Sequence, residues 1–136
     1  MARVVLDCRS VFPGMGGIGR YAGLLAGRLP GLDPANEYHL LLTERCSGPA
    51  LLAAPNVRER RFECGMIDER WEQLELPGEL AGIPADLYHS TCFSLPVAGG
   101  AGRTVVTVHD VVFRRHPGLV NERLRGYFDR WTAVSL

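Results

Sequence analysis

Lysine is absent from this sequence, and every basic side chain other than the four histidines is an arginine. Arginine suits bidentate contacts with phosphate, but a GC-rich coding bias explains the missing lysine more simply. Neither charge is in excess, because 15 arginines balance 15 aspartates and glutamates. The bulk charge therefore gives no support to nucleic acid or an anionic membrane surface as a partner.

The sequence also lacks long apolar runs. No segment approaches the roughly 18 apolar residues of a membrane span, and the N-terminus has no signal-peptide pattern. These absences predict a cytoplasmic protein. They leave peripheral contact with the inner face of a membrane open as an alternative.

Motifs that bind metals or carry nucleophiles are missing as well. The sequence has no Walker lysine, no serine-hydrolase elbow, no His-Glu-x-x-His pattern and no cluster of acids. We therefore expect no bound metal and no cofactor. The cysteines form no Cys-x-x-Cys pair and are expected to be reduced, mostly buried thiols. They are Cys8, Cys46, Cys64 and Cys92.

What the sequence does contain is an alternation of strand and helix patterns over 136 residues, 46% of them apolar. This length and composition predict a single domain with a hydrophobic core. Strands are expected at residues 3–8, 38–43, 57–62, 86–89 and 104–109, and helices at 18–29, 68–76 and 121–132. Short helical turns are expected at 50–54 and 79–82, and a loop at 111–117. The order predicts an α/β, Rossmann-like fold with a mostly parallel sheet and helices on both faces.

Several finer expectations follow from local patterns. Pro30-Gly31 should end the first helix, and Pro77-Gly78 should interrupt the second. Strand 104–109 is the strongest candidate, because it is β-branched and nearly all apolar. Strand 57–62 should be a solvated edge, since arginines alternate along it. The second helix should direct its apolar side chains inward, namely Ile67, Trp71, Leu74 and Leu76.

Polar residues follow three of the predicted strands. They are the glycine-rich stretch 14–21, the pair His89-Ser90 and the pair His109-Asp110. Carboxyl ends of parallel strands meet at one edge of a sheet, where ligands of such folds gather. These three segments should therefore share one rim.

The glycine stretch reads Gly14-x-Gly16-x-x-Gly19, which matches the letters of the dinucleotide fingerprint, and Glu44 follows the second strand as a ribose-binding acid would. The fingerprint places its first glycine directly after the strand, however, whereas Arg9 to Pro13 intervene here. Dinucleotide binding thus stays a minor alternative, beside a tight turn with no ligand.

His109-Asp110 is the more specific pair. A histidine at the end of a strand can act as a general base or as a hydrogen-bond donor to a sugar hydroxyl or a phosphate. The alternative is a histidine satisfied by backbone groups. Because adjacent strand residues point to opposite faces, direct pairing of His109 with Asp110 does not follow.

Four motifs together resemble a known family. They are Leu6-Asp7-x-Arg9, Gly17-Ile18-Gly19-Arg20-Tyr21, His89-Ser90 with Leu95-Pro96, and Val106-Thr107-Val108-His109-Asp110. In this order they resemble the N-terminal domain of GT-B glycosyltransferases of family 4, retaining enzymes that include many mannosyltransferases. The resemblance extends over almost the whole chain.

The resemblance implies transfer of a sugar from a nucleotide-sugar to a glycan or a lipid-linked acceptor, with retained anomeric configuration and no essential metal. It gives His109 and Asp110 the catalytic positions, with His109 contacting the transferred sugar or the acceptor and Asp110 supporting the same pocket. It also implies a set of residues that bind the donor phosphate or the acceptor. These are Gly16, Gly17, Arg20, Tyr21, His89 and Ser90.

Nothing in the sequence corresponds to the nucleotide-binding C-terminal domain of that family or to its Glu-x7-Glu motif. We therefore expect an incomplete acceptor-side domain that is inactive alone. A stand-alone, non-catalytic binding module is the alternative. A sheet cut short in this way should expose an edge or an apolar face, which predicts self-association into a homo-oligomer.

Overall fold

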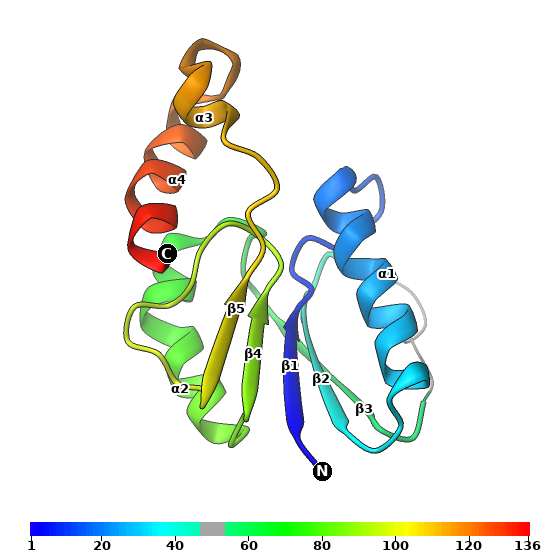
Figure 1. The fold of residues 1–136 in the computed structure, drawn as a ribbon. Coiled ribbons are helices and arrows are strands. Elements are labelled where there is room, and N and C mark those ends of the chain that lie inside the picture. Colours follow the sequence, from blue (N-terminus) through cyan, green and yellow to red (C-terminus); the bar gives the residue numbers. More distant parts are fainter. Residues whose placement is uncertain (47–53) are drawn as a thin grey trace.

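Five strands form one parallel sheet in the computed structural model of this protein, which describes residues 1–46 and 54–136 (Figure 1). Their order is β3-β2-β1-β4-β5, and every neighbouring pair is parallel. The strands are β1 (Arg3–Asp7), β2 (Glu37–Thr43), β3 (Val57–Phe62), β4 (Leu87–Ser90) and β5 (Arg103–Val106). The predicted α/β, Rossmann-like fold is confirmed. The short turn predicted at 50–54 falls outside the described residues, apart from Ala54.

Helices cover both faces of this sheet (Figure 1). On one face lies α1 (Gly17–Leu32), and on the other lie the π-helix η1 (Trp71–Glu75) and α2 (Leu76–Gly82), which continue one another. Beyond the carboxyl ends of the strands follow α3 (Val112–Arg115), the 3₁₀-helix η2 (Pro117–Leu119) and α4 (Glu122–Ser135). Among the described residues, no helix is both long and apolar enough to cross a bilayer.

Alternation along the strands divides the core into two layers. In β1, Leu6 packs with the α1 layer, whereas Val5 packs with the η1–α2 layer. Both faces are apolar because a parallel sheet is covered on both sides. A third cluster lies past the carboxyl ends and joins α3 and α4 to the sheet; its buried members are Cys92, Phe93, Phe113, Tyr127 and Phe128.

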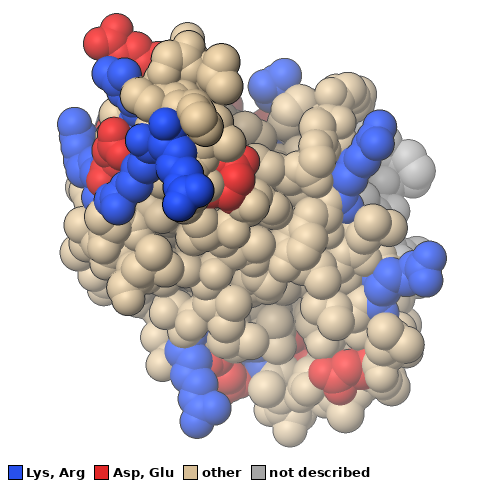
Figure 2. Space-filling model, turned by 45° about the horizontal axis from the view of Figure 1, so that its top comes forward, with Lys and Arg blue, Asp and Glu red and all other residues tan. Residues whose placement is uncertain are grey.

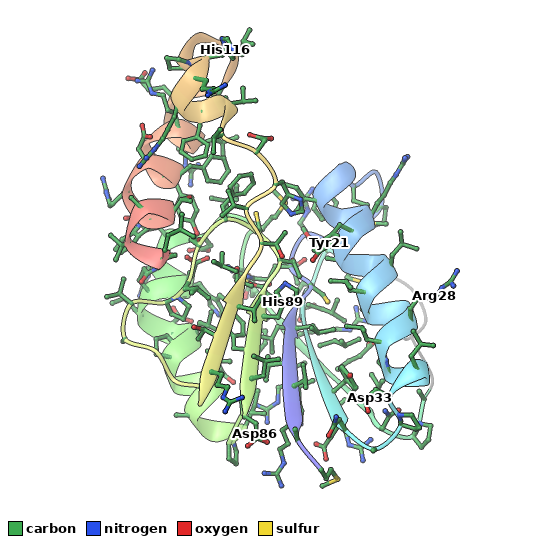
Figure 3. All side chains as sticks on the ribbon, in the orientation of Figure 1. Tyr21, Arg28, Asp33, Asp86, His89 and His116 are labelled. Atoms are coloured by element: carbon green, nitrogen blue, oxygen red, sulfur yellow. The ribbon has the colours of Figure 1, made fainter. Side chains whose placement is uncertain are left out.

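One half of the α1 face is left open. Because α1 covers β1 and β2, a groove of about 700 Å³ remains between it and strands β4 and β5, from Leu87 to His89 along β4 and at Arg103 of β5. Val4 and Leu87 lie in its floor, while Asp33 and Asp86 lie at its two sides (Figure 3). The groove leaves part of the sheet uncovered, and its lining mixes apolar residues such as Val4 and Leu87 with polar ones such as Asn36.

The prediction that Pro30 ends the first helix is wrong. Helix α1 runs on to Leu32, and the Asp33 N–H closes its last turn by donating to the Leu29 carbonyl at 3.0 Å. A proline this close to a C-terminus removes only one donor, and Pro30 is fully buried against the core. Its packing therefore offsets the lost hydrogen bond.

The second helix also departs from prediction, because it contains a π turn. The Leu76 N–H donates to the Trp71 carbonyl five residues back, so both side chains face the core, while Leu74 is 73% exposed. An α-helical period had placed Leu74 inward. Pro77 does not interrupt the helix, since it stands in the first turn of α2, where a missing N–H is tolerated.

Strand β5 is shorter than predicted and lies at the sheet edge. It ends at Val106 because β4, its neighbour, ends at Ser90. The chain then leaves the sheet, so His109 and Asp110 follow in irregular backbone. The expected loop at 111–117 contains α3.

The predicted last helix is confirmed as α4, with the Asn121 side chain accepting from the Arg123 N–H at 2.9 Å.

Charged side chains are unevenly spread over the surface. Figure 2 shows arginines and acidic side chains side by side over the lobe formed by α3 and α4, and further arginines on the side of α1. Strand β3 lies at an edge of the sheet, and the side chain of Arg58 on it is exposed. The predicted solvated edge is therefore confirmed.

Candidate functional site

The glycine loop leads from β1 to α1 through residues 8–16. Gly19 is required for packing, because a Cβ there would lie 2.3 Å from the Ser10 carbonyl oxygen. Gly14 has φ +80°, which favours glycine. Around Gly16 and Gly17, by contrast, the space where a side chain would stand is empty. The backbone is thus open to solvent just where α1 begins.

The first turn of α1 carries no acidic residue and no side-chain cap. Its leading N–H groups have no partner within the helix, as at any helix start. The open space around Gly16 and Gly17 leaves these donors accessible. An anionic or hydroxyl-rich ligand can reach this turn without displacing a side chain.

Four side chains meet beside this turn, at the carboxyl ends of β4 and β5, and we call them the histidine cluster: Tyr21, His89, Thr107 and His109. The Thr107 Oγ1 lies 2.8 Å from His89 Nε2 and 3.1 Å from the Tyr21 hydroxyl. The Tyr21 ring meets the His109 ring edge-on, with centroids 5.2 Å apart. Figure 3 shows Tyr21 of α1 close to His89 at the upper end of β4.

His109 has a tautomer set by the backbone. Its Nε2 lies 2.7 Å from the Thr91 carbonyl oxygen, which can only accept, so Nε2 carries the hydrogen. In the neutral ring, Nδ1 therefore holds a lone pair, and it has no partner among the described residues. Phe93 and Tyr21 contact the ring at 5.6 and 5.2 Å between centroids and fix its plane. Nδ1 can accept a hydrogen bond or a proton from a ligand hydroxyl.

Burial favours the neutral form of His89. Burial lowers the pKa of this half-buried imidazole below its ordinary value, and the charge of Asp7 offsets only part of that effect. A neutral imidazole and two hydroxyls make a continuous chain from His89 through Thr107 to Tyr21. The chain fixes the Tyr21 hydroxyl at the edge of the cluster.

The structure separates other residues that the motifs grouped together. The Asp110 carboxylate does not join the cluster but accepts from the Val112 N–H at 2.9 Å, at the start of α3. Ser90 is fully buried and faces the η1–α2 side of the sheet, away from His89. Arg20 is exposed on the first turn of α1. Of the residues predicted for the site, Tyr21, His89 and His109 come together, with Gly16 and Gly17 beside them.

Sequence reasoning missed a buried charge network on the opposite face of the same rim. The Arg9 guanidinium lies 2.6 Å from an Asp7 oxygen and 2.9 Å from a Glu72 oxygen, and all three side chains are at most 3% exposed. Tyr88 donates to Asp7 at 2.9 Å and Tyr127 donates to Glu72 at 2.7 Å. The network ties the end of β1 to η1, β4 and α4.

Burial and pairing act against each other in this network. Burial would raise the pKa of Asp7, but the charge and hydrogen bonds of Arg9 outweigh it and hold the pKa below its usual value. Both partners thus stay charged in the interior. Asp7 and Arg9, two charged residues directly after an apolar strand, were a signal in the sequence. Glu72 gave none, because a π turn places it inward.

Comparison with known proteins found no match to this chain among protein-family models, curated proteins or solved structures. The proposal of a function therefore rests on the geometry of the residues at the carboxyl ends of the strands. Within residues 1–46 and 54–136, no three His, Cys, Asp or Glu side chains come close enough together to hold a metal ion.

Proposed function

We propose that this chain is the acceptor-side domain of a retaining glycosyltransferase of GT-B architecture, similar to family 4. The observation that carries the proposal is that His109 Nδ1, without a partner among the described residues, belongs to a cluster with Tyr21, which follows the open backbone of Gly16 and Gly17 by one helical turn. Sugars present many hydroxyl groups, each able to donate to such a nitrogen.

In this proposal each part of the rim has one task. The N–H groups at Gly16 and Gly17 approach the donor diphosphate, and the positive end of α1 favours its charge. His109 Nδ1 accepts from a hydroxyl of the transferred sugar or of the acceptor. Tyr21 forms the side wall. Asp110 supports the pocket only indirectly, since it follows His109 and its carboxylate accepts from the Val112 N–H at the start of α3.

The donor is a nucleotide-sugar and the acceptor a glycan or a lipid-linked saccharide. The nucleotide itself is bound by a facing domain, and this chain alone does not transfer sugar. We place the protein in the cytoplasm, where nucleotide-sugars are available.

The test is sugar transfer by the chain in its native gene context. UDP- and GDP-hexoses are supplied with a detergent-solubilised lipid and glycan extract, and nucleotide release and the anomeric configuration of the product are measured. His109→Ala should lower kcat/KM by about 100-fold, the usual effect of losing a positioned acid–base or hydrogen-bonding group. His116→Ala, which removes an exposed histidine outside the cluster, is the matched control and should leave transfer unchanged.

Equal activity of the two variants would refute the role of His109, and a product of inverted configuration would refute the family. The alternative of a stand-alone binding module has its own support, since one chain builds the whole histidine cluster. Methyl hexosides that shift the NMR signals of Tyr21 and His109, without any transfer in the native gene context, would favour that module.

A further inference from the structure

His89 is reached from two sides. Its Nε2 lies 2.8 Å from the Thr107 Oγ1 in the histidine cluster, and its side chain also lines the groove over β4 and β5. Its Nδ1 has no hydrogen-bond partner among the described residues, but it is not buried either, so water can reach it. In His109 the Nε2 must carry the hydrogen. In His89, by contrast, the one N–H hydrogen of the neutral ring can be on either nitrogen.

The Thr107 hydroxyl stands between two partners and has one hydrogen to donate. When His89 Nε2 carries the hydrogen, it donates to Thr107, Thr107 donates to Tyr21, and the Tyr21 O–H is left for a ligand. When His89 Nδ1 carries the hydrogen, Tyr21 donates to Thr107 and Thr107 donates to Nε2. Tyr21 then offers a ligand only a lone pair. The chain of hydrogen bonds thus has two directions, and the tautomer of His89 selects between them.

The backbone holds Thr107 in this position. Its N–H donates to the Ser90 carbonyl at 2.9 Å, and its carbonyl accepts from the Phe93 N–H at 3.0 Å. Its side chain is β-branched, so it has few allowed rotamers. The Thr107 Oγ1 is therefore kept between His89 and Tyr21.

We propose that Thr107 is a positioning residue, which couples the tautomer of His89 to the hydrogen bond that Tyr21 offers a ligand. Interconversion of the two directions conserves hydrogens. His89 Nδ1 releases one proton to water while the Tyr21 end of the chain takes one up, and each group between passes its own proton along. The coupling itself needs no ligand.

The coupling also defines the ligand that the cluster selects, a consequence that rests on the proposed function. His109 Nδ1 accepts in the neutral ring, whereas Tyr21 donates when His89 Nε2 carries the hydrogen. The two rings are in contact, so the cluster then offers an acceptor and a donor from neighbouring side chains. Two adjacent hydroxyls of a sugar match this pair, because one can donate while the other accepts. Such a ligand favours the Nε2–H tautomer of His89.

The test in the free chain is nitrogen-15 NMR of the histidine rings, whose signals distinguish the two tautomers. Tyr21→Phe keeps the ring that contacts His89 and removes only the hydroxyl, which bonds to Thr107. We expect Tyr21→Phe to shift the His89 signals in the otherwise unchanged chain and in a Thr107→Ser background, which keeps a hydroxyl. It should not shift them in a Thr107→Val background. Thr104→Val, at an exposed position of β5, is the matched control and should leave the His89 signals unchanged.

The test with a ligand is titration with methyl hexosides. Tyr21→Phe and Thr107→Val should each weaken binding by about fivefold, the usual effect of losing one hydrogen bond between neutral groups, and the double variant should bind no more weakly than either. Circular dichroism checks that each variant remains folded.

His89 signals that do not respond to Tyr21→Phe, or that shift equally in the Thr107→Val background, would overturn the coupling. Absence of hexoside binding by the unchanged chain would instead refute the sugar as ligand and with it the proposed function. The spectra of the free chain decide the role of Thr107 by themselves, so the two failures are distinguishable.

Discussion

Glu72 is the residue on which the buried network of this protein depends. Its carboxylate receives the Arg9 guanidinium and the hydroxyls of Ser94 and Tyr127, while it is itself 1% exposed. Removing one charge from a buried pair leaves the other charge without compensation, which costs far more than the loss of an exposed pair. Arg9 is especially sensitive, because its Nη1 is already buried without a partner among the described residues.

We predict that Glu72→Gln lowers the free energy of unfolding by about 3 kcal/mol. Glutamine has nearly the same shape, so the loss reports the charge rather than packing. Glu75→Gln, which changes an exposed residue of the same π turn, is the control and should stay within about 0.5 kcal/mol. Urea unfolding followed by circular dichroism measures both. Similar values for the two variants would mean that the network contributes no net stability.

At the scale of elements, the π turn decides which residues of the second helix reach the core. Trp71 and Leu76 are five residues apart and both buried, whereas Leu76 and Leu80 are four apart and both buried. The helix therefore contains one residue more than an α-helical period allows, and the exposed Leu74 lies in that turn. The widened turn is also where Glu72 enters the network, in keeping with the frequency of π turns at functional sites.

Deleting Leu74 should convert the π turn into an α turn, because Trp71 and Leu76 would then be four residues apart. We expect the fold to persist, with stability changed by no more than about 1 kcal/mol. Deleting Glu79 in α2 is the control, since it rotates the fully buried Leu80 out of the core and should cost about 2–5 kcal/mol. Thermal unfolding of the two deletion variants compares their stabilities. Equal losses would show that the π geometry itself is needed.

At the scale of the whole molecule, the sheet is covered unevenly. Helices η1 and α2 pack on one face of the sheet, whereas the α1 face is open over β4 and β5, where the groove lies. Strand β5 is an edge with unpaired backbone groups on one side, and Val105 on it is 43% exposed. An open edge beside an apolar face offers a second chain a place to pair.

Self-association through this edge stays a prediction. Multi-angle light scattering over a range of concentrations should show a dimer that dissociates on dilution. Val105→Lys should give a monomer, because a lysine on an edge strand opposes pairing. Leu24→Lys, at a 63% exposed position of α1, is the control and should leave the dimer intact. A monomer at every concentration would contradict the prediction.

The sequence by itself determined the fold class, because strand and helix periods depend on neighbouring residues. Apolar runs, together with the alternation along residues 57–62, predicted the five strands, and Asn121 predicted the start of α4. It also placed Tyr21, His89 and His109 on one rim, since all carboxyl ends of a parallel sheet point the same way. The strands, the start of α4 and the shared edge of these three residues could be predicted without knowing which distant segments pack together.

Only the tertiary structure decided which of those residues meet. Thr107 joins His89 to Tyr21, and the Thr91 carbonyl fixes the tautomer of His109; both contacts connect segments that are distant in the sequence. Asp110 lies outside the cluster, because its carboxylate accepts from the Val112 N–H at the start of α3. Glu72 entered the interior because a π turn shifted its helix, and that shift is set by packing against the sheet rather than by local pattern.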